Sequence, residues 1–425
     1  MIAALILANG FSPGHASCVI RLFIAAVGVA GLLCGCSTIR QTKMTDLAPV
    51  LHGVSNEFES VLASPGSFRL QVLIAEIMTN RLGHTELRRQ GYRVDAEYFY
   101  PASSIKLCAG VSALQIIEQL QPASLRTDLA DAPMEIAPLF PGDAPQAGDT
   151  SNLKGGQISV THEVRKLALV SDNQAFNRLY DLVGHEELNR SMHAAGLRSV
   201  VINHRLSEPR TIPNMRASAS ITLRVPGGDP IVIPARNSSL ILTNSGKGLR
   251  VGVAYLKGDQ RVGAPMDFSG RNGISLVDLQ DLLVKVARPD IDPGTPPLRL
   301  SASHREQLLQ VMTGYPREST NPVYPAKAYA DESSKFLLPG IRRVFPSTVR
   351  GERVEITGKP GRAYGFSIEN SYVRNPVNGR AVFVTVVLYT NADGILNDDK
   401  YEYETVADPF FADLGELIAR HWLTD

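Results

Sequence analysis

The chain has 425 residues, of which 44% are hydrophobic and 20% are charged, so it can bury a core and is not disordered as a whole. Its 43 basic and 42 acidic residues leave a formal net charge of +1, which argues against a nucleic-acid-binding protein. The 35 glycines and 27 prolines follow no collagen-like period, and no repeat spacing indicates a solenoid or a propeller.

Residues 1–35 differ in composition from the rest of the chain. Arg21 is their only charged residue, and the apolar run that follows it, residues 22–33, is shorter than a transmembrane helix needs. A basic residue, a short apolar run and a small-residue cleavage site are typical of a secretory signal peptide. The first 18 residues fit this pattern poorly, and a start at Val19 is an alternative.

The sequence Leu33-Cys34-Gly35-Cys36 resembles a bacterial lipobox, in which the last cysteine becomes the lipid-carrying first residue of the mature chain. This resemblance implies lipidation at Cys36 and a membrane-anchored protein that faces the periplasm or the cell surface. A plain signal peptide or an uncleaved anchor is the alternative. We interpret residues 36–65 as a tether between the anchor and the folded domain at 66–425.

Cys108 is then the only cysteine of the folded part. A single cysteine excludes an internal disulfide and a zinc site built from thiolates. We expect Cys108 to be a small buried hydrophobic residue rather than a nucleophile. The sequence indicates no metal or other cofactor.

In the first half of the folded part, apolar patterning predicts a strand at 68–78 and a buried helix at 103–120. Residues 121–156 are rich in Pro, Ala, Asp and Gly, and we expect a long surface excursion there. Two short helices are predicted at 173–183 and 186–195, each followed by a glycine.

The second half ends in three strands and a helix. The predicted elements are strands at 230–234 and 249–256, helices at 276–286 and 304–312, strands at 354–359, 364–373 and 381–390, and a helix at 406–422. Strands at both ends of the domain and helices between them predict an α+β fold, with one antiparallel sheet built from both termini and a helical subdomain.

Ser103 and Lys106 form a Ser-x-x-Lys motif at the head of a predicted helix. This spacing places the hydroxyl and the amine on one helix face, about one turn apart. Serine needs a base beside it to act as a nucleophile, and lysine can be that base if its pKa falls. The motif alone is weak, because it occurs by chance in many chains.

Two further motifs follow in order, Ser171-Asp172-Asn173 at a predicted helix start and Lys359-Pro360-Gly361 after a predicted strand. Taken alone, the first is an ordinary helix cap and the second a hairpin turn. The order of the three motifs is the signature of the penicillin-recognising serine hydrolases. Over residues 68–422, insertions apart, the chain resembles the class A β-lactamase family.

This resemblance implies that Ser103 is the acylated nucleophile, Lys106 its general base or proton relay, and Ser171 the group that passes the proton to the departing nitrogen. It also implies that Asn173 binds the substrate's side-chain amide and that Lys359 supplies positive charge for the substrate carboxylate.

The resemblance further implies an oxyanion hole made by the backbone N–H groups of Ser103 and Arg362. Two such donors lower the barrier by about 3 kcal/mol each. Gly361 is expected to be glycine because a substrate backbone lies close along that strand.

The chain departs from the family pattern at two places. Pro360 replaces a Thr or Ser whose hydroxyl binds the substrate carboxylate, so we expect weaker recognition or a contact from Arg362 instead. The nearest match to the deacylating glutamate is Glu208, with Ile212 at the position where a water-holding Asn is expected. Glu208 is either that base or an ordinary solvated loop residue.

Residues 218–300 are longer than the corresponding stretch of a compact class A enzyme, and we favour a structural wing over a substrate-restricting lid. The sequence predicts an exported, monomeric serine hydrolase that cleaves a β-lactam or a related amide through an acyl-serine, with a role in antibiotic resistance. The alternatives are a cell-wall D,D-peptidase or amidase that deacylates slowly, acting on a peptidoglycan-like peptide, and a non-catalytic envelope binding protein.

Overall fold

The computed structural model describes residues 44–424, apart from residues 82, 152, 348–350 and 352–353. All of these residues belong to one compact unit. The predicted signal peptide and Cys36 lie outside the described residues. Within the described part, no helix combines the length and the apolar character that crossing a membrane requires.

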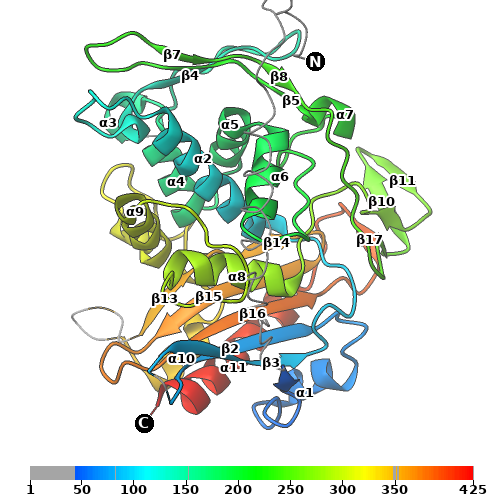
Figure 1. Ribbon diagram of the computed structural model, residues 1–425. Helices are drawn as coiled ribbons and strands as arrows, with labels where there is room; N and C mark the ends of the chain where they lie inside the picture. The colour runs from blue at the N-terminus through cyan, green and yellow to red at the C-terminus, as the bar shows by residue number, and fades with distance from the viewer. Residues whose placement is uncertain (1–43, 82, 152, 348–350, 352–353, 425) are drawn as a thin grey trace, which may run out of the picture. The chain divides into compact units, whose positions relative to one another are not determined.

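A seven-stranded sheet joins strands from both ends of the domain (Figure 1). Its order is β1-β3-β2-β16-β15-β13, with β14 also paired to β15. The strands are β1 (Thr45–Asp46), β2 (Gln71–Thr79), β3 (Thr85–Tyr92), β13 (Glu355–Gly358), β14 (Gly361–Ala363), β15 (Phe366–Arg374) and β16 (Ala381–Tyr389). Early strand β2 lies antiparallel to late strand β16, so the predicted α+β sheet built from both termini is confirmed.

One face of the sheet is covered by three helices, α1 (Asn56–Ala63), α10 (Leu338–Val344) and α11 (Asp408–Ile418). Alternate residues of the central strands, such as Val384 and Val386, point into this layer. Phe58 of α1 stacks on Phe410 of α11 with ring centroids 4.8 Å apart. The part of the predicted tether that the structure describes, residues 44–65, is therefore packed on the domain, because its apolar side chains are buried there.

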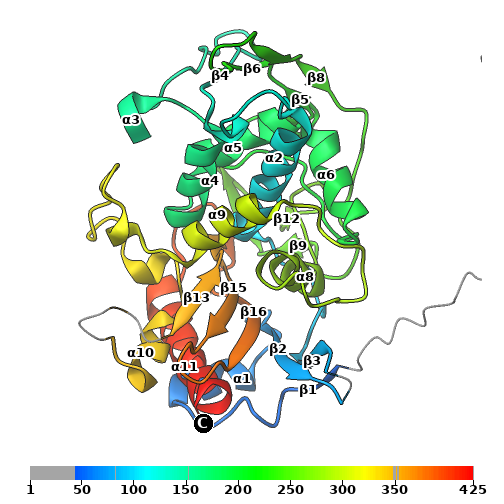
Figure 2. The same ribbon diagram turned by 60° about the vertical axis from the view of Figure 1, so that its left-hand side comes forward.

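The other face carries α8 (Leu276–Ala287), and a group of helices lies beyond it (Figure 2). This group comprises α2 (Lys106–Leu120), α4 (Val160–Leu169), α5 (Asn173–Val183), α6 (His185–Ala194) and α9 (Ala302–Thr313). Helix α2 is buried among α4, α5 and α6 and contains the free, fully buried Cys108. The predicted helix at 173–183 is confirmed at both ends.

The stretch at 121–156 is more than a surface excursion, because β4 (Met134–Ile136) lies within it and buries Met134 and Ile136. β4 forms a small sheet with β6 (Ile221–Leu223) and β7 (Ile231–Ile233). The remaining short elements here are α3 (Leu153–Gly156), α7 (Ile212–Met215), β5 (Ala217–Ser218) and β8 (Arg236–Asn237).

The stretch 218–300 is not a single inserted part, since its last helix, α8, packs on the main sheet. The segment before α8 contributes to two small sheets. β9 (Arg250–Val251) pairs with β12 (Met266–Asp267), and β10 (Ala254–Lys257) pairs with β11 (Gln260–Val262) on one side and β17 (Ile395–Leu396) on the other. The last pairing joins this segment to the loop that follows the last long strand, β16.

Candidate active site

Ser103 lies in a short 3-10 turn, Ala102–Ile105, that leads directly into α2. Ala102 has a φ of 49°, a left-handed conformation that is unfavourable for a residue with a Cβ, so the turn is strained just before the serine. Ser103 is partly exposed and lines a pocket. Among the described residues, its hydroxyl has no hydrogen-bond partner.

Lys106 is fully buried at the first position of α2. Its Nζ donates to the carbonyl oxygen of Ser171 and to the Ser171 hydroxyl, 3.2 Å away. Burial lowers the pKa of Lys106 to about 7, although the charge of Asp172 opposes this shift. At neutral pH this amine is therefore neutral in a substantial fraction of the molecules, as a general base requires.

Ser171 connects Lys106 to a second buried lysine, Lys359. Lys359 Nζ donates to the Ser171 hydroxyl at 2.8 Å and to the Pro360 carbonyl at 2.9 Å. Burial, together with the nearby charges of Lys106 and Lys335, holds the pKa of Lys359 well below its usual value. Two amines thus converge on one hydroxyl, which can pass a proton between them and a substrate atom.

Behind Lys359 lies a buried glutamate that sequence reasoning missed. Glu369 on β15 is fully buried and accepts a hydrogen bond from Phe336 N at 2.7 Å. Its negative charge opposes the lowering of the pKa of Lys359 and of the neighbouring Lys335. Glu369 therefore partly compensates the buried lysines of the site.

Gly361 opens β14, which pairs with β15 and approaches the Ser103 turn with its other side. A Cβ at position 361 would lie 2.7 Å from Ser103 N and 2.8 Å from the Pro101 carbonyl oxygen. Glycine is thus required by the approach of the Ser103 turn itself, a reason the sequence did not show. Ser103 and Arg362 line the same pocket, which is compatible with an oxyanion hole formed by their N–H groups.

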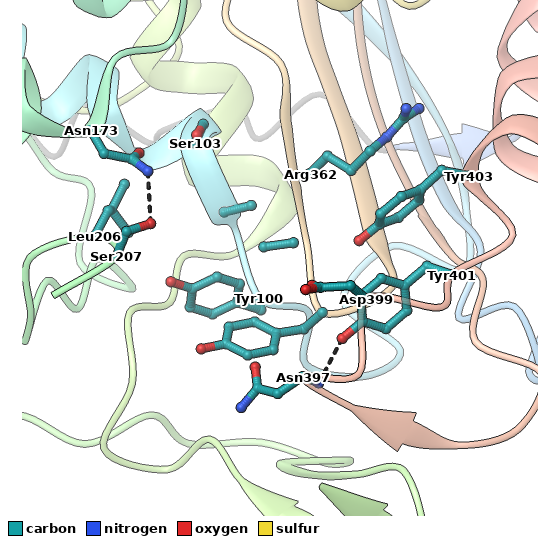
Figure 3. A pocket seen from close by; sticks show the side chains of 13 residues that line it. Tyr100, Ser103, Asn173, Leu206, Ser207, Arg362, Asn397, Asp399, Tyr401 and Tyr403 are labelled. Atoms are coloured by element: carbon teal, nitrogen blue, oxygen red, sulfur yellow. Dashed lines mark hydrogen bonds between the residues drawn. The ribbon is translucent and has the colours of Figure 1, made fainter. Parts of the chain in front are cut away.

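Asn173 begins α5, whose cap is Asp172 accepting from Ala175 N at 2.7 Å. The Asn173 side chain also lines the pocket and donates to the Ser207 hydroxyl at 2.8 Å (Figure 3). Sequence reasoning missed Ser207, which lies one residue before the expected base, Glu208.

Glu208 does not line the pocket and is engaged elsewhere. Its carboxylate is bonded to Arg210, and Arg205 Nε lies 3.8 Å from its other oxygen. The described structure therefore does not bring Glu208 together with Ser103. The physical reason is local, since the two arginines on either side of Glu208 hold its carboxylate.

The pocket has a volume of about 410 Å³ and contains several residues that the motifs did not indicate. They are Tyr100, Leu206, Ser207, Ala363, Tyr364, Asn397, Asp399, Tyr401 and Tyr403. Tyr100 lies three residues before Ser103, so its closeness in sequence to the Ser-x-x-Lys motif was a usable signal. The residues after 390 come from a loop without a motif.

Because Pro360 lacks a hydroxyl, the sequence suggested that Arg362 contacts a substrate carboxylate instead. The structure shows that the Arg362 side chain is engaged elsewhere and is not available for this contact. Its guanidinium is bonded to Asp408, and its Nε donates to Ser367 Oγ at 3.0 Å. The same group lies over the rings of Phe336 and Tyr403. These contacts engage the guanidinium, which points away from Asp399 (Figure 3).

Comparison with known proteins addresses the same region of the chain. Residues 75–238 match the model of the β-lactamase enzyme family. Over these residues, which are less than half of the chain, the protein is similar to that family. The match includes Ser103, Lys106 and the Ser171–Asn173 motif, whereas Lys359 and Gly361 lie outside it and reach the site through the fold. The family and this arrangement together identify a serine hydrolase of the β-lactamase type.

The chain is also similar to solved β-lactamase structures, at low sequence identity. That of Burkholderia ambifaria is 15% identical, with a TM-score of 0.48, and the similarity covers 85% of this chain and 97% of that one. That of Burkholderia phymatum is 17% identical, with a TM-score of 0.46 and coverage of 87% and 99%. No protein with a curated description matches the chain.

Proposed function

We propose that this protein is an exported serine hydrolase of the class A type that opens a β-lactam or cleaves a related amide through an ester on Ser103. The observation that carries the proposal is the convergence of two buried lysines on the Ser171 hydroxyl beside the pocket that holds Ser103. Burial keeps both amines from carrying a full charge, which is the state in which one can accept a proton.

In the proposed acylation step, the Ser103 oxygen attacks the amide carbon while neutral Lys106 accepts the hydroxyl proton. The carbonyl oxygen becomes negative and accepts hydrogen bonds from the N–H groups of Ser103 and Arg362. Ser171 then donates its proton to the amide nitrogen as the C–N bond breaks, and it regains a proton from Lys106. The product is an acyl-serine ester; the amine stays attached to the opened ring of a β-lactam and leaves only from an acyclic amide.

Hydrolysis of this ester needs a water molecule and a base that activates it. In the described structure, Ser207 and Asn173 lie beside the pocket, and Glu208 is held by arginines. This geometry favours the second candidate function, a peptidase-like enzyme that is acylated quickly by β-lactams and releases them slowly. In that enzyme Lys106 would also activate the water molecule.

The test is a time course of intact-protein mass with a penicillin added to the purified domain. We expect a mass increase equal to the whole penicillin in the wild-type protein and none in the Ser103→Ala variant. A long-lived adduct supports the peptidase-like enzyme, and rapid decay with multiple turnover supports the lactamase. An adduct that forms equally on Ser103→Ala would refute the proposed mechanism, and no adduct on either protein would favour a non-catalytic binding protein.

We also propose that Cys36 carries a lipid that anchors the enzyme in the envelope, which rests on the lipobox-like sequence. Detergent-phase partitioning of the full chain tests this location. Partitioning should be lost in Cys36→Ala, and unchanged partitioning of that variant would refute the anchor.

A further inference from the structure

The outer part of the active-site pocket has a distinct chemical character. One wall is formed by the loop between β16 and α11, which contributes four residues to the pocket lining, Asn397, Asp399, Tyr401 and Tyr403. The wall beneath them is aromatic, since Tyr100 and Tyr364 contact each other with ring centroids 5.0 Å apart. Phe268 packs against both rings and is itself fully buried.

Asp399 supplies the only carboxylate among the described residues that line this pocket. Its side chain is exposed and points toward the centre of the pocket (Figure 3). Among the described residues, no hydrogen bond or ion pair engages this carboxylate. A negative charge is thus presented to whatever occupies the pocket.

The loop holds Asp399 in place through contacts of its neighbours. Asn397 N donates to the Tyr401 hydroxyl at 2.8 Å, and Asn397 Nδ2 donates to the Leu256 carbonyl at 3.0 Å. The adjacent Asp398 does not line the pocket, and its carboxylate accepts from Lys400 N at 3.1 Å. The turn is therefore fixed by the chain on both sides of Asp399.

No cationic side chain without a partner is found among the described residues that line the pocket. Arg362 is the only cationic residue among the described residues of the lining, and its guanidinium is already engaged by Asp408 and two aromatic rings. Pro360 offers neither a hydroxyl nor an N–H to an anion. Among the described lining residues, an anionic group in the outer pocket would thus meet Asp399 and no cationic side chain without a partner.

We propose that the outer part of this pocket binds a positively charged group of the acyl substrate, an ammonium or a guanidinium, between Asp399 and the tyrosines. A carboxylate attracts a cation at short range, and aromatic faces add to the attraction. This inference rests on the proposed function, because it assigns a substrate class to the same pocket. The specificity it predicts is the opposite of a site built around a substrate carboxylate.

The first test compares penicillins that share one nucleus and differ only in the charge of the acyl side chain. We expect the second-order rate of Ser103 acylation to be about 10-fold higher for an amino-bearing side chain than for a neutral one at low salt, and lower again for a carboxylate-bearing one. The preference should shrink at 0.5 M salt, since part of this interaction is exposed to solvent.

Asp399→Asn removes the charge and keeps the shape, and Asp398→Asn is the matched control because it removes one charge from the next position. The preference should be lost in Asp399→Asn and retained in Asp398→Asn. Equal loss in both variants would mean that the total negative charge of the loop, and not Asp399 itself, causes the preference. A preference that survives Asp399→Asn would overturn the assigned site.

A second measurement separates this inference from the proposed function. Calorimetry on Ser103→Ala measures the binding of two capped dipeptide amides, one with lysine and one with norleucine, so that no acylation is required. We expect about 10-fold tighter binding of the lysine peptide, which Asp399→Asn in the same background abolishes. Equal binding of the two peptides refutes the cation site, whether or not the wild-type protein forms an acyl-enzyme.

Discussion

The two sides of Ser103 differ in how they are built. On one side, Lys106 and Lys359 are buried and donate to the same hydroxyl of Ser171. On the other side, the pocket presents the Ser207 hydroxyl, and the nearest glutamate in the sequence is held by two arginines. The lysine proposed for acylation is thus bonded to Ser171, whereas the carboxylate of Glu208, the expected base for hydrolysis, is bonded to Arg210.

The largest expected effect concerns the base of the acylation side. Lys106→Ala should lower the rate of acylation by about 10²–10⁴-fold, because it removes the group that accepts the Ser103 proton. In the wild-type protein this rate should rise with pH through about 7, since only the neutral amine acts as a base. Stopped-flow acylation between pH 5 and 9 measures both effects.

The control for this prediction is Lys106→Arg, which keeps a cation but does not deprotonate. It should be as inactive as the alanine variant at every pH. A flat pH profile of the wild-type protein would contradict the role of Lys106.

Gly361→Ala should lower acylation by roughly 10²-fold and destabilise the fold by about 1–3 kcal/mol, because the new methyl group meets the backbone of the Ser103 turn. Denaturant unfolding and acylation kinetics check the two effects. Gly263→Ala is the matched control, since a Cβ there meets no atom within 4 Å. Normal acylation in Gly361→Ala would mean that the strand and the turn are further apart in solution.

The hydrolytic side can be tested by adding the missing group. Ser207→Glu places a carboxylate beside Asn173 and should accelerate release of the acyl group by about 10–10²-fold, at or below the lower end of the range for a positioned base. The measurement is the decay of the mass adduct after excess penicillin is removed. Thr211→Glu, an exposed position outside the pocket, should leave the decay unchanged.

The smallest effect is expected for Glu208. Because its carboxylate is bonded to Arg210, Glu208→Gln should change deacylation by less than about 3-fold and cost ~1 kcal/mol or less from the lost, partly exposed ion pair. Single-turnover kinetics measure the first quantity. Accumulation of acyl-enzyme in this variant alone would show that Glu208 reaches the water molecule during the reaction.

The acylation side was accessible from sequence because its geometry is largely local. Ser103 and Lys106 are one helical turn apart, and Ser171 precedes a helix whose cap residues are recognisable. The sheet was predicted for a similar reason, since the nearly continuous apolar run in 381–390 indicates a strand buried on both faces. The position of Gly361 against the Ser103 turn could not be predicted, because it depends on how elements that are distant in the sequence pack together.

The hydrolytic side shows where such reasoning ends. Ser207 has a φ of 52°, and this single left-handed residue helps decide which side chain of its loop faces the pocket. Nothing in the order Arg-Leu-Ser-Glu-Pro fixes that turn. Asp399 and Tyr401 lie almost three hundred residues after Ser103, and their place depends on the pairing of β17 with β10, which no local pattern encodes.

That pairing has a consequence for how the enzyme's selectivity can change. Two hydrogen bonds hold the wall that carries Asp399: Val253 N donates to the Gly394 carbonyl at 2.7 Å, and Asn397 donates to the Leu256 carbonyl. None of these residues belongs to the proton-transfer group around Ser171. Substitutions in the segment at 250–262 can therefore shift or reshape this wall while the lysines keep their contacts. A library of variants confined to that segment would change which substrates bind while the groups proposed to transfer protons stay the same.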